Sequence, residues 1–171
     1  GILLSSAIKR YADFFGVACG EKNVLFTNND SAYETAISLI QKGINIEAII
    51  DNREEVDSKL LYEVKKNNIR IFKGYTVTDT FGYKRINKIS IKQLSKDGQK
   101  VVGSKIDLSC DCLGISGGWT PAVHLFTQSG GKLKFREEDQ VFIPNIYPSD
   151  QLSIGSCNGD FTLDEILTNT P

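Results

Sequence analysis

Short apolar runs alternate with amphipathic helical patterns over residues 23–72, and this alternation restricts the possible folds more than any other feature of the chain. Runs rich in β-branched residues predict strands, and apolar residues at helical spacing predict helices. The strands are expected at residues 23–26, 46–50 and 69–72, and the helices at residues 30–42 and 57–66. This β-α-β-α-β order implies a parallel sheet with right-handed crossovers.

The segments on either side of this unit follow other patterns. Apolar residues at three- and four-residue spacings predict a leading helix over residues 5–15 that stops at Gly16. From Tyr75 to Leu108, short apolar runs separated by turn residues predict an antiparallel meander. The remaining elements are expected as strands at 112–116, 132–135, 141–143 and 152–154 and helices at 122–128 and 163–168. The predicted fold class is α/β, a three-layer Rossmann-like parallel sheet with an antiparallel meander.

Charge and composition exclude several kinds of partner. The 171 residues include 20 Lys and Arg against 21 Asp and Glu, so nothing marks a surface for nucleic acid or an anionic membrane. No window approaches the roughly 18 apolar residues of a membrane span, and residues 1–5 lack the features of a signal peptide. We therefore expect a cytoplasmic chain. Because it contains no Met and begins with Gly1, we also expect a processed or excised piece of a longer protein.

The cysteines and the single histidine form no recognisable catalytic or metal motif. Cys110 and Cys112 would share one face of a strand, and their C-x-C spacing differs from common zinc and redox motifs. Inert strand thiols are favoured over a redox or metal role. His124 could act as a general base beside Trp119, but no neighbouring carboxylate organises it, which favours a packed or hydrogen-bonded structural residue. We expect no metal site and no catalytic residue.

The turn after the first parallel strand lacks the glycines of a dinucleotide site. Where G-x-G-x-x-G or -A would allow a tight turn and close approach of a pyrophosphate, the chain has Thr27, Asn29 and Ala32. Ala32 permits close helix packing, but the Thr27 and Asn29 side chains occupy space that the pyrophosphate would use. Asp51 follows about twenty residues later, where it would either bind a ribose hydroxyl or serve as a turn or capping residue.

An apolar strand that ends at paired glycines marks a second place where a nucleotide could be held. Residues 112–116 lead into Gly117 and Gly118, which are followed by Trp119. Open α/β sheets bind ligands in crevices at such strand ends. Trp119 could stack on a ring or serve as a core or interface anchor.

Four motifs, spread over most of the chain, carry a resemblance to a known family. They are VLFTNNDSAY at residues 24–33, SGGWTPAVHLF at 116–126, QSGGKL at 128–133 and IGSCNG at 154–159. Residues 116–133 are the most specific part, because generic dinucleotide binding requires none of these side chains. The chain resembles part of the alpha subunit of the heterotetrameric sarcosine oxidases.

The resemblance implies a fold similar to flavoprotein reductases in which one nucleotide-binding domain is inserted into another. Residues 1–16 would be a leading helix and residues 17–116 the inserted NAD(P)-binding-like domain. Residues 117–171 would be the returning part of a second FAD/NAD(P)-binding domain, whose own glycine-rich turn would lie upstream of this chain.

The resemblance also implies cofactors and partners. NAD would be shared with the upstream part of the protein, and flavins would be carried by partner subunits, chiefly the beta subunit. The NAD site would be lined by Gly117, Gly118, Trp119, Gly155 and Asn158. The expected function is NAD-holding and structural support for oxidative demethylation of sarcosine, with O2 and tetrahydrofolate as acceptors.

Two other functions stay open. One is a pyridine-nucleotide-binding domain of another FAD/NAD-linked reductase or amino-acid dehydrogenase, which nucleotide binding at residues 27–32 would favour. The other is a non-catalytic interaction module. In either case an isolated piece would expose an unpaired sheet edge, so we also expect self-association.

Overall fold

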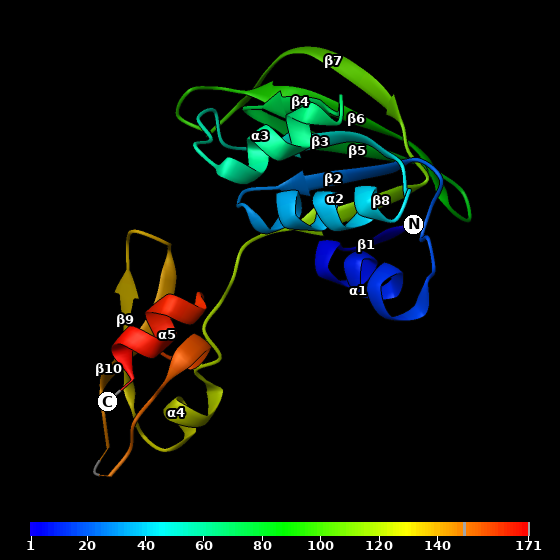
Figure 1. Ribbon diagram of the computed structural model, residues 1–171. Coiled ribbons are helices and arrows are strands. Elements are labelled where there is room, and N and C mark those ends of the chain that lie inside the picture. The colour runs from blue at the N-terminus through cyan, green and yellow to red at the C-terminus, as the bar shows by residue number, and fades with distance from the viewer. Residues whose placement is uncertain (149, 171) are drawn as a thin grey trace. The chain divides into compact units, whose positions relative to one another are not determined.

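A computed structural model describes residues 1–148 and 150–170. The chain divides into two compact units (Figure 1), unit 1 being Gly1–Gly118 and unit 2 beginning at Trp119.

Unit 1 is built on a five-stranded sheet with the strand order β1-β8-β2-β3-β4, in which every pair is parallel. The strands are β1 (Ile2–Leu4), β2 (Asn23–Thr27), β3 (Ile46–Asp51), β4 (Arg70–Lys73) and β8 (Cys112–Ser116). Thr27 pairs in register with Asp51 on one side and with Ser116 on the other. The carboxyl ends of β8, β2 and β3 therefore lie side by side. The predicted α/β class with a parallel sheet is confirmed.

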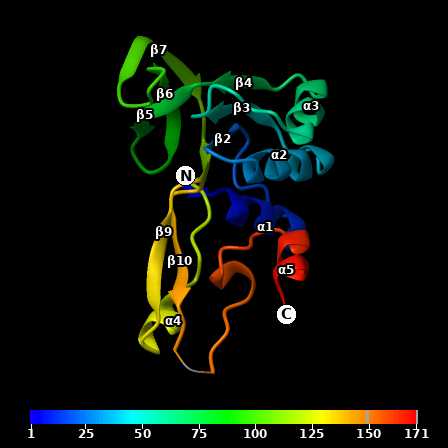
Figure 2. The same cartoon turned by 90° about the vertical axis from the view of Figure 1, so that its left-hand side faces the viewer.

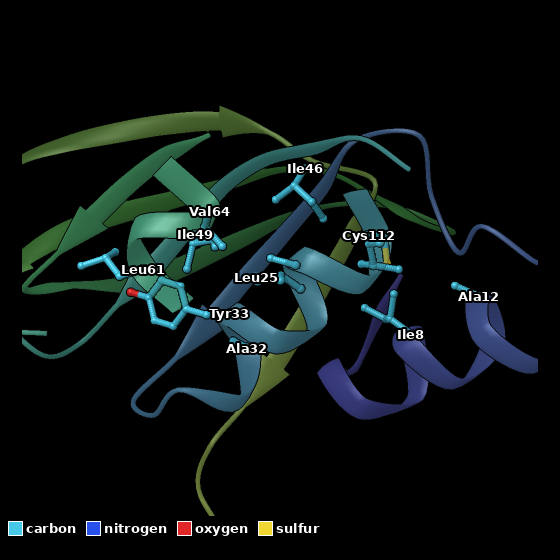
Figure 3. Close-up of a cluster of buried hydrophobic side chains, with 12 residues drawn as sticks. Ile8, Ala12, Leu25, Ala32, Tyr33, Ile46, Ile49, Leu61, Val64 and Cys112 are labelled. Atoms are coloured by element: carbon cyan, nitrogen blue, oxygen red, sulfur yellow. The ribbon is translucent and has the colours of Figure 1, made fainter. Parts of the chain in front are cut away.

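Three helices cover one face of this sheet. They are α1 (Ser5–Phe15), α2 (Ser31–Gln41) and α3 (Lys59–Lys66). Figure 3 shows their buried side chains against the sheet, with Ile8, Tyr33 and Val64 facing Leu25 and Ile49. Because neighbouring strand residues point to opposite faces, Leu25 and Ile49 fix which face the helices bury.

The antiparallel meander covers the other face. It consists of β5 (Tyr75–Gly82), β6 (Ile86–Leu94) and β7 (Val101–Ser109). Val24 and Ile50, the strand neighbours of the helix-facing residues, pack against Ile89, Ile91 and Leu108 of the meander. Figure 2 shows the meander and the helices on opposite sides of the parallel sheet. Unit 1 thus has the three layers that the sequence predicts.

Unit 2 is smaller and contains a two-stranded antiparallel sheet. Its elements are α4 (His124–Gln128), β9 (Lys132–Arg136), β10 (Val141–Ile146), the 3-10 helix η1 (Gly155–Cys157) and α5 (Leu163–Asn169). Phe126 is buried and meets Tyr147 edge to face, with ring centroids 5.0 Å apart. Thr162 caps α5 by accepting a hydrogen bond from the Glu165 backbone N–H, and the Glu165 side chain bonds back in a capping box.

Two strand predictions differ from the structure. Ile2–Leu4 forms β1 ahead of the predicted helix, because its backbone pairs with Leu113, Gly114 and Ile115 of β8. The strand predicted at residues 152–154 is not formed. There the apolar side chains of Leu152 and Ile154 are exposed while Ser153 is buried, so the alternation does not bury an apolar face.

The prediction that Cys110 and Cys112 share a strand face is wrong. Cys112 begins β8 and packs on the helix side of the sheet, whereas Cys110 lies between β7 and β8 and packs on the meander side. Both thiols are free and buried. Burial raises the pKa of each thiol to about 11, so neither forms appreciable thiolate near neutral pH. This supports the prediction that they are inert.

Candidate functional site

The turn that follows β2 lies at the sheet edge where open α/β folds hold nucleotides. The hydroxyl of Thr27 is buried with its residue and donates to the Asn29 carbonyl oxygen at 2.8 Å. The same hydroxyl accepts the Asn29 backbone N–H at 3.1 Å. These contacts fill the turn with protein atoms at the two positions where a dinucleotide site has glycine.

The first turn of α2 is capped from within the same segment. Asn29 Oδ1 accepts hydrogen bonds from the Ser31 backbone N–H at 3.0 Å and from Ser31 Oγ at 2.6 Å. The backbone N–H groups of Tyr33 and Glu34 donate to the Asp30 carbonyl oxygen. Free N–H groups at a helix N-terminus are what binds phosphate in nucleotide sites. Here the backbone donors of Ser31, Tyr33 and Glu34 already have protein acceptors.

Asp51 ends β3 and is completely buried, yet both of its carboxylate oxygens have partners. Oδ1 accepts from the Arg53 backbone N–H at 2.9 Å and from Arg53 Nε at 3.1 Å. Oδ2 accepts from Arg53 Nη2 and from the Tyr33 hydroxyl, each at 2.8 Å. A carboxylate offers about four acceptor positions, and four donors already use them. The structure therefore gives Asp51 the turn role and leaves no acceptor position for ribose hydroxyls.

The pKa shifts in this cluster have the directions expected of a closed ion pair. The hydrogen bond to Asp51 raises the pKa of the Arg53 guanidinium above its ordinary value, and the ion pair with Asp30 at 2.8 Å acts in the same direction. Burial raises the pKa of the Tyr33 hydroxyl, and its bond to the Asp51 carboxylate adds to this. Tyr33 thus stays a neutral donor and Arg53 a cation.

Sequence reasoning identified Asp51 but missed its two partners. Arg53 could have been found, because an arginine two residues after a strand-ending aspartate can fold back onto it. Tyr33 lies 18 residues from Asp51 and meets it only because α2 packs on the sheet beside β3. No local pattern indicates that contact.

The proposed cofactor-lining residues fall into two sets. Gly117 and Gly118 follow β8 at the end of unit 1. A Cβ on Gly117 would meet nothing within 4 Å, whereas Gly118 has a φ of +103°, which favours glycine. Gly117 is therefore the one that leaves open space at the end of β8.

The other three candidates belong to unit 2. Trp119 is exposed, and its ring centroid lies 6.2 Å from that of Phe161. Gly155 and Asn158 share the η1 turn, where the Asn158 N–H donates to the Gly155 carbonyl oxygen at 2.8 Å. The Asn158 side chain is already engaged, since its Oδ1 accepts from the Tyr147 hydroxyl and its Nδ2 donates to Asp160.

The remaining chemical candidates do not assemble a site. His124 is exposed at the first turn of α4, so of the two structural roles predicted from the sequence the packed one is wrong. Within residues 1–148 and 150–170, no three His, Cys, Asp or Glu side chains cluster in a way that could hold a metal ion. In the same part of the chain, no helix has the length and apolar character needed to cross a membrane.

Sequence comparison matches nearly the whole chain to a segment of sarcosine oxidase subunit alpha. The protein from Corynebacterium sp. (strain P-1) is 31% identical over 163 residues, covering 94% of this chain and 16% of that protein. The protein from Corynebacterium sp. (strain U-96) is 28% identical over 159 residues, 93% of this chain and 16% of that protein. No protein-family model matches the chain. The resemblance is thus confirmed, and the chain spans about one sixth of the length of these relatives.

Structure comparison identifies the fold. Thioredoxin reductase from T. acidophilum matches with a TM-score of 0.62 and 20% identity, over 94% of this chain and 54% of that chain. L-Proline dehydrogenase from P. horikoshii matches with a TM-score of 0.57 and 18% identity, over 92% of this chain and 25% of that chain. The chain therefore has a Rossmann-like α/β fold similar to that of these two oxidoreductases.

Proposed function

We propose that this chain is a non-catalytic segment of a sarcosine oxidase-type alpha subunit, in which unit 1 keeps a dinucleotide-binding fold as a scaffold. One observation carries the proposal: both oxygens of the buried Asp51 carboxylate are bonded to Arg53 and Tyr33. The similarity to sarcosine oxidase subunit alpha supports the choice of protein class. A dinucleotide does not fit the turn after β2, because Thr27 and Asn29 fill it.

NAD would instead be held by the segment that returns from unit 1, together with parts of the subunit outside this chain. Gly117, Gly118 and Trp119 would line this site, with Gly155 and Asn158 from η1. The open space at Gly117 and the exposed ring of Trp119 support this assignment. The domain division that goes with it has residues 17–116 as the insertion and residues 117–171 as the returning segment.

The whole subunit would act with partner subunits, chiefly a flavin-bearing beta subunit, in the oxidative demethylation of sarcosine with O2 and tetrahydrofolate. A bound flavin would supply the redox chemistry, and this chain would provide structure and cofactor contacts. The alternative is a pyridine-nucleotide-binding domain of another reductase or amino-acid dehydrogenase, with its ligand at residues 27–32. The closed pairing of Asp51 argues against that alternative.

The test compares Gly117→Val with Asp51→Asn in the complete subunit, measuring NAD bound per folded protein. Valine would fill the open space beside Gly117, so we expect at least a tenfold loss of bound NAD. Asp51→Asn is expected to leave the NAD content of the folded fraction unchanged. Loss of NAD on Asp51→Asn, with retention on Gly117→Val, would overturn the proposal.

A further inference from the structure

The turn after β2 is hydrogen-bonded to the segment by which the chain leaves unit 1. The parallel ladder between β2 and β8 ends at the pair Thr27 and Ser116. Beyond it, the backbone N–H of Asn28 donates to the Ser116 carbonyl oxygen at 3.3 Å. The Asn28 side-chain Nδ2 then reaches one residue further, to the carbonyl oxygen of Gly117, at 3.3 Å.

Side chains of the same turn add further bonds to Ser116. Asn29 Nδ2 donates to the Ser116 carbonyl oxygen at 3.3 Å, and Ser31 Oγ lies 2.7 Å from Ser116 Oγ. The Ser116 hydroxyl also lies 3.3 Å from Asn29 Oδ1. Three polar residues of the turn region, Asn28, Asn29 and Ser31, therefore converge on the last residue of β8 and the residue after it.

These hydrogen bonds lie next to the point where the chain passes from unit 1 to unit 2. The boundary between the two units falls directly after Gly118. A Cβ on Gly118 would lie 3.7 Å from Asn28 Oδ1, so the amide of Asn28 lies against the last residue of unit 1. The connection to unit 2 therefore starts from backbone that the turn already holds.

We propose that Asn28, Asn29 and Ser31 form an exit latch, which fastens Ser116 and Gly117 to unit 1 and restrains the start of the connection to unit 2. In a dinucleotide-binding turn, glycines allow the backbone to approach a pyrophosphate. Here amide and hydroxyl side chains of the same turn bind the neighbouring strand exit instead. The restraint operates without a ligand, and it stands whether or not NAD is held elsewhere in the protein.

Two substitutions would open the exit latch by different routes. Ser116→Ala removes the hydroxyl that meets Ser31 and Asn29. Asn28→Asp replaces the donor Nδ2 by a carboxylate oxygen, which the Gly117 carbonyl oxygen repels. Asn28 is exposed, so this variant is expected to fold. Asn45→Ala is the matched control. The Asn45 side-chain amide donates to the Glu47 carboxylate at the start of β3, which is the opposite end of the sheet from the exit latch.

The readout is the NMR order parameter of the Gly117 and Gly118 backbone amides. In the unaltered chain we expect values close to rigid backbone, about 0.85, falling below about 0.6 in Ser116→Ala and Asn28→Asp. The amides of β2 and β3 should keep their values in all variants, which separates loosening from unfolding. Values below about 0.6 in the unaltered chain, or no change in either variant, would overturn the exit latch.

Discussion

Asp51 and Arg53 form an ion pair in which the carboxylate is fully buried while the guanidinium is about one-third exposed. Arg53→Met keeps most of the aliphatic stem and removes the charge. Losing one partner of a fully buried ion pair costs about 3–5 kcal/mol, and partial exposure of Arg53 reduces this to about 2–4 kcal/mol. Tyr33→Phe removes only one hydrogen bond to the carboxylate, and a hydrogen bond to a charged group is worth about 1.5–3 kcal/mol.

Urea unfolding followed by far-ultraviolet circular dichroism measures both effects. Arg53→Met is expected to lower the free energy of unfolding more than Tyr33→Phe does. If Arg53→Met were no more destabilising than Tyr33→Phe, the account of Asp51 as a carboxylate held mainly by Arg53 would be wrong.

The buried thiols of Cys110 and Cys112 predict a loss of stability at alkaline pH. Burial raises the pKa of each folded thiol from 9.0 to about 11, so the unfolded chain ionises first as the pH rises. The free energy of unfolding should fall from near pH 9 until the folded pKa is passed. Tyr33, whose pKa is also raised above 10.0, adds to the loss at the upper end.

Urea midpoints measured from pH 7 to pH 11 test this. Cys112→Ala lowers stability at neutral pH, but it should give a shallower decline above pH 9, because one titrating thiol is gone. A decline as steep as that of the unaltered chain would show that other groups control the alkaline transition.

Among the helices and strands, the local sequence pattern was sufficient to predict those elements that are long and bury a repeating set of apolar side chains. The strands at residues 23–26 and 46–50 and the helices between and after them follow from periodicity alone. Ile2–Leu4 was missed because a three-residue strand has almost no pattern, and its partner β8 begins more than a hundred residues later. Residues 152–154 show the opposite error, since alternation there exposes the apolar side chains.

In the candidate site, too, features carried by the local sequence could be predicted, and contacts between distant residues could not. The loss of glycines at Thr27 and Asn29 is visible in the sequence, and so is the place of Asp51 at a strand end. The partners that close the site depend on packing, because Tyr33 reaches Asp51 only through the docking of α2. The contact of Ser31 with Ser116 likewise joins residues 85 positions apart.

The backbone at Gly20, just before β2, lies close to Asp111 and Cys112 at the start of β8. Gly20→Ala is therefore expected to destabilise the fold. A Cβ there would lie 2.4 Å from Asp111 Oδ1 and 2.5 Å from the Cys112 Cβ. Asp111 accepts the backbone N–H groups of Glu21 and Lys22, so it cannot move aside freely. Overpacking of this kind costs about 1–3 kcal/mol.

Gly117→Ala is the control for Gly20→Ala, because its Cβ would meet nothing within 4 Å. It is expected to change the free energy of unfolding by less than about 0.5 kcal/mol. Chemical denaturation of both variants measures the difference. Equal stability of the two would contradict the close packing between the Gly20 loop and β8.

At the scale of the whole molecule, the free edge of β1 predicts self-association of the chain. β1 lies at the edge of the sheet and pairs with β8, and its Ile2 and Leu4 side chains are exposed. The opposite edge strand, β4, carries Arg70 and Lys73, charges that discourage pairing. Light scattering from low to high micromolar concentration should show growing association, reduced by Leu4→Lys. A strictly monomeric chain would contradict this.

In unit 1 the turn after β2, where this fold can hold a dinucleotide, is closed by the protein's own side chains. Calorimetric titration of residues 1–171 with NADH, beside the Asp51→Ala variant, tests it most directly. We expect no saturable binding at the turn after β2 in either protein, because Arg53 and Tyr33 already bond the Asp51 carboxylate. Saturable binding that Asp51→Ala weakens would show that the turn is open to a dinucleotide and that unit 1 is a functional nucleotide-binding domain.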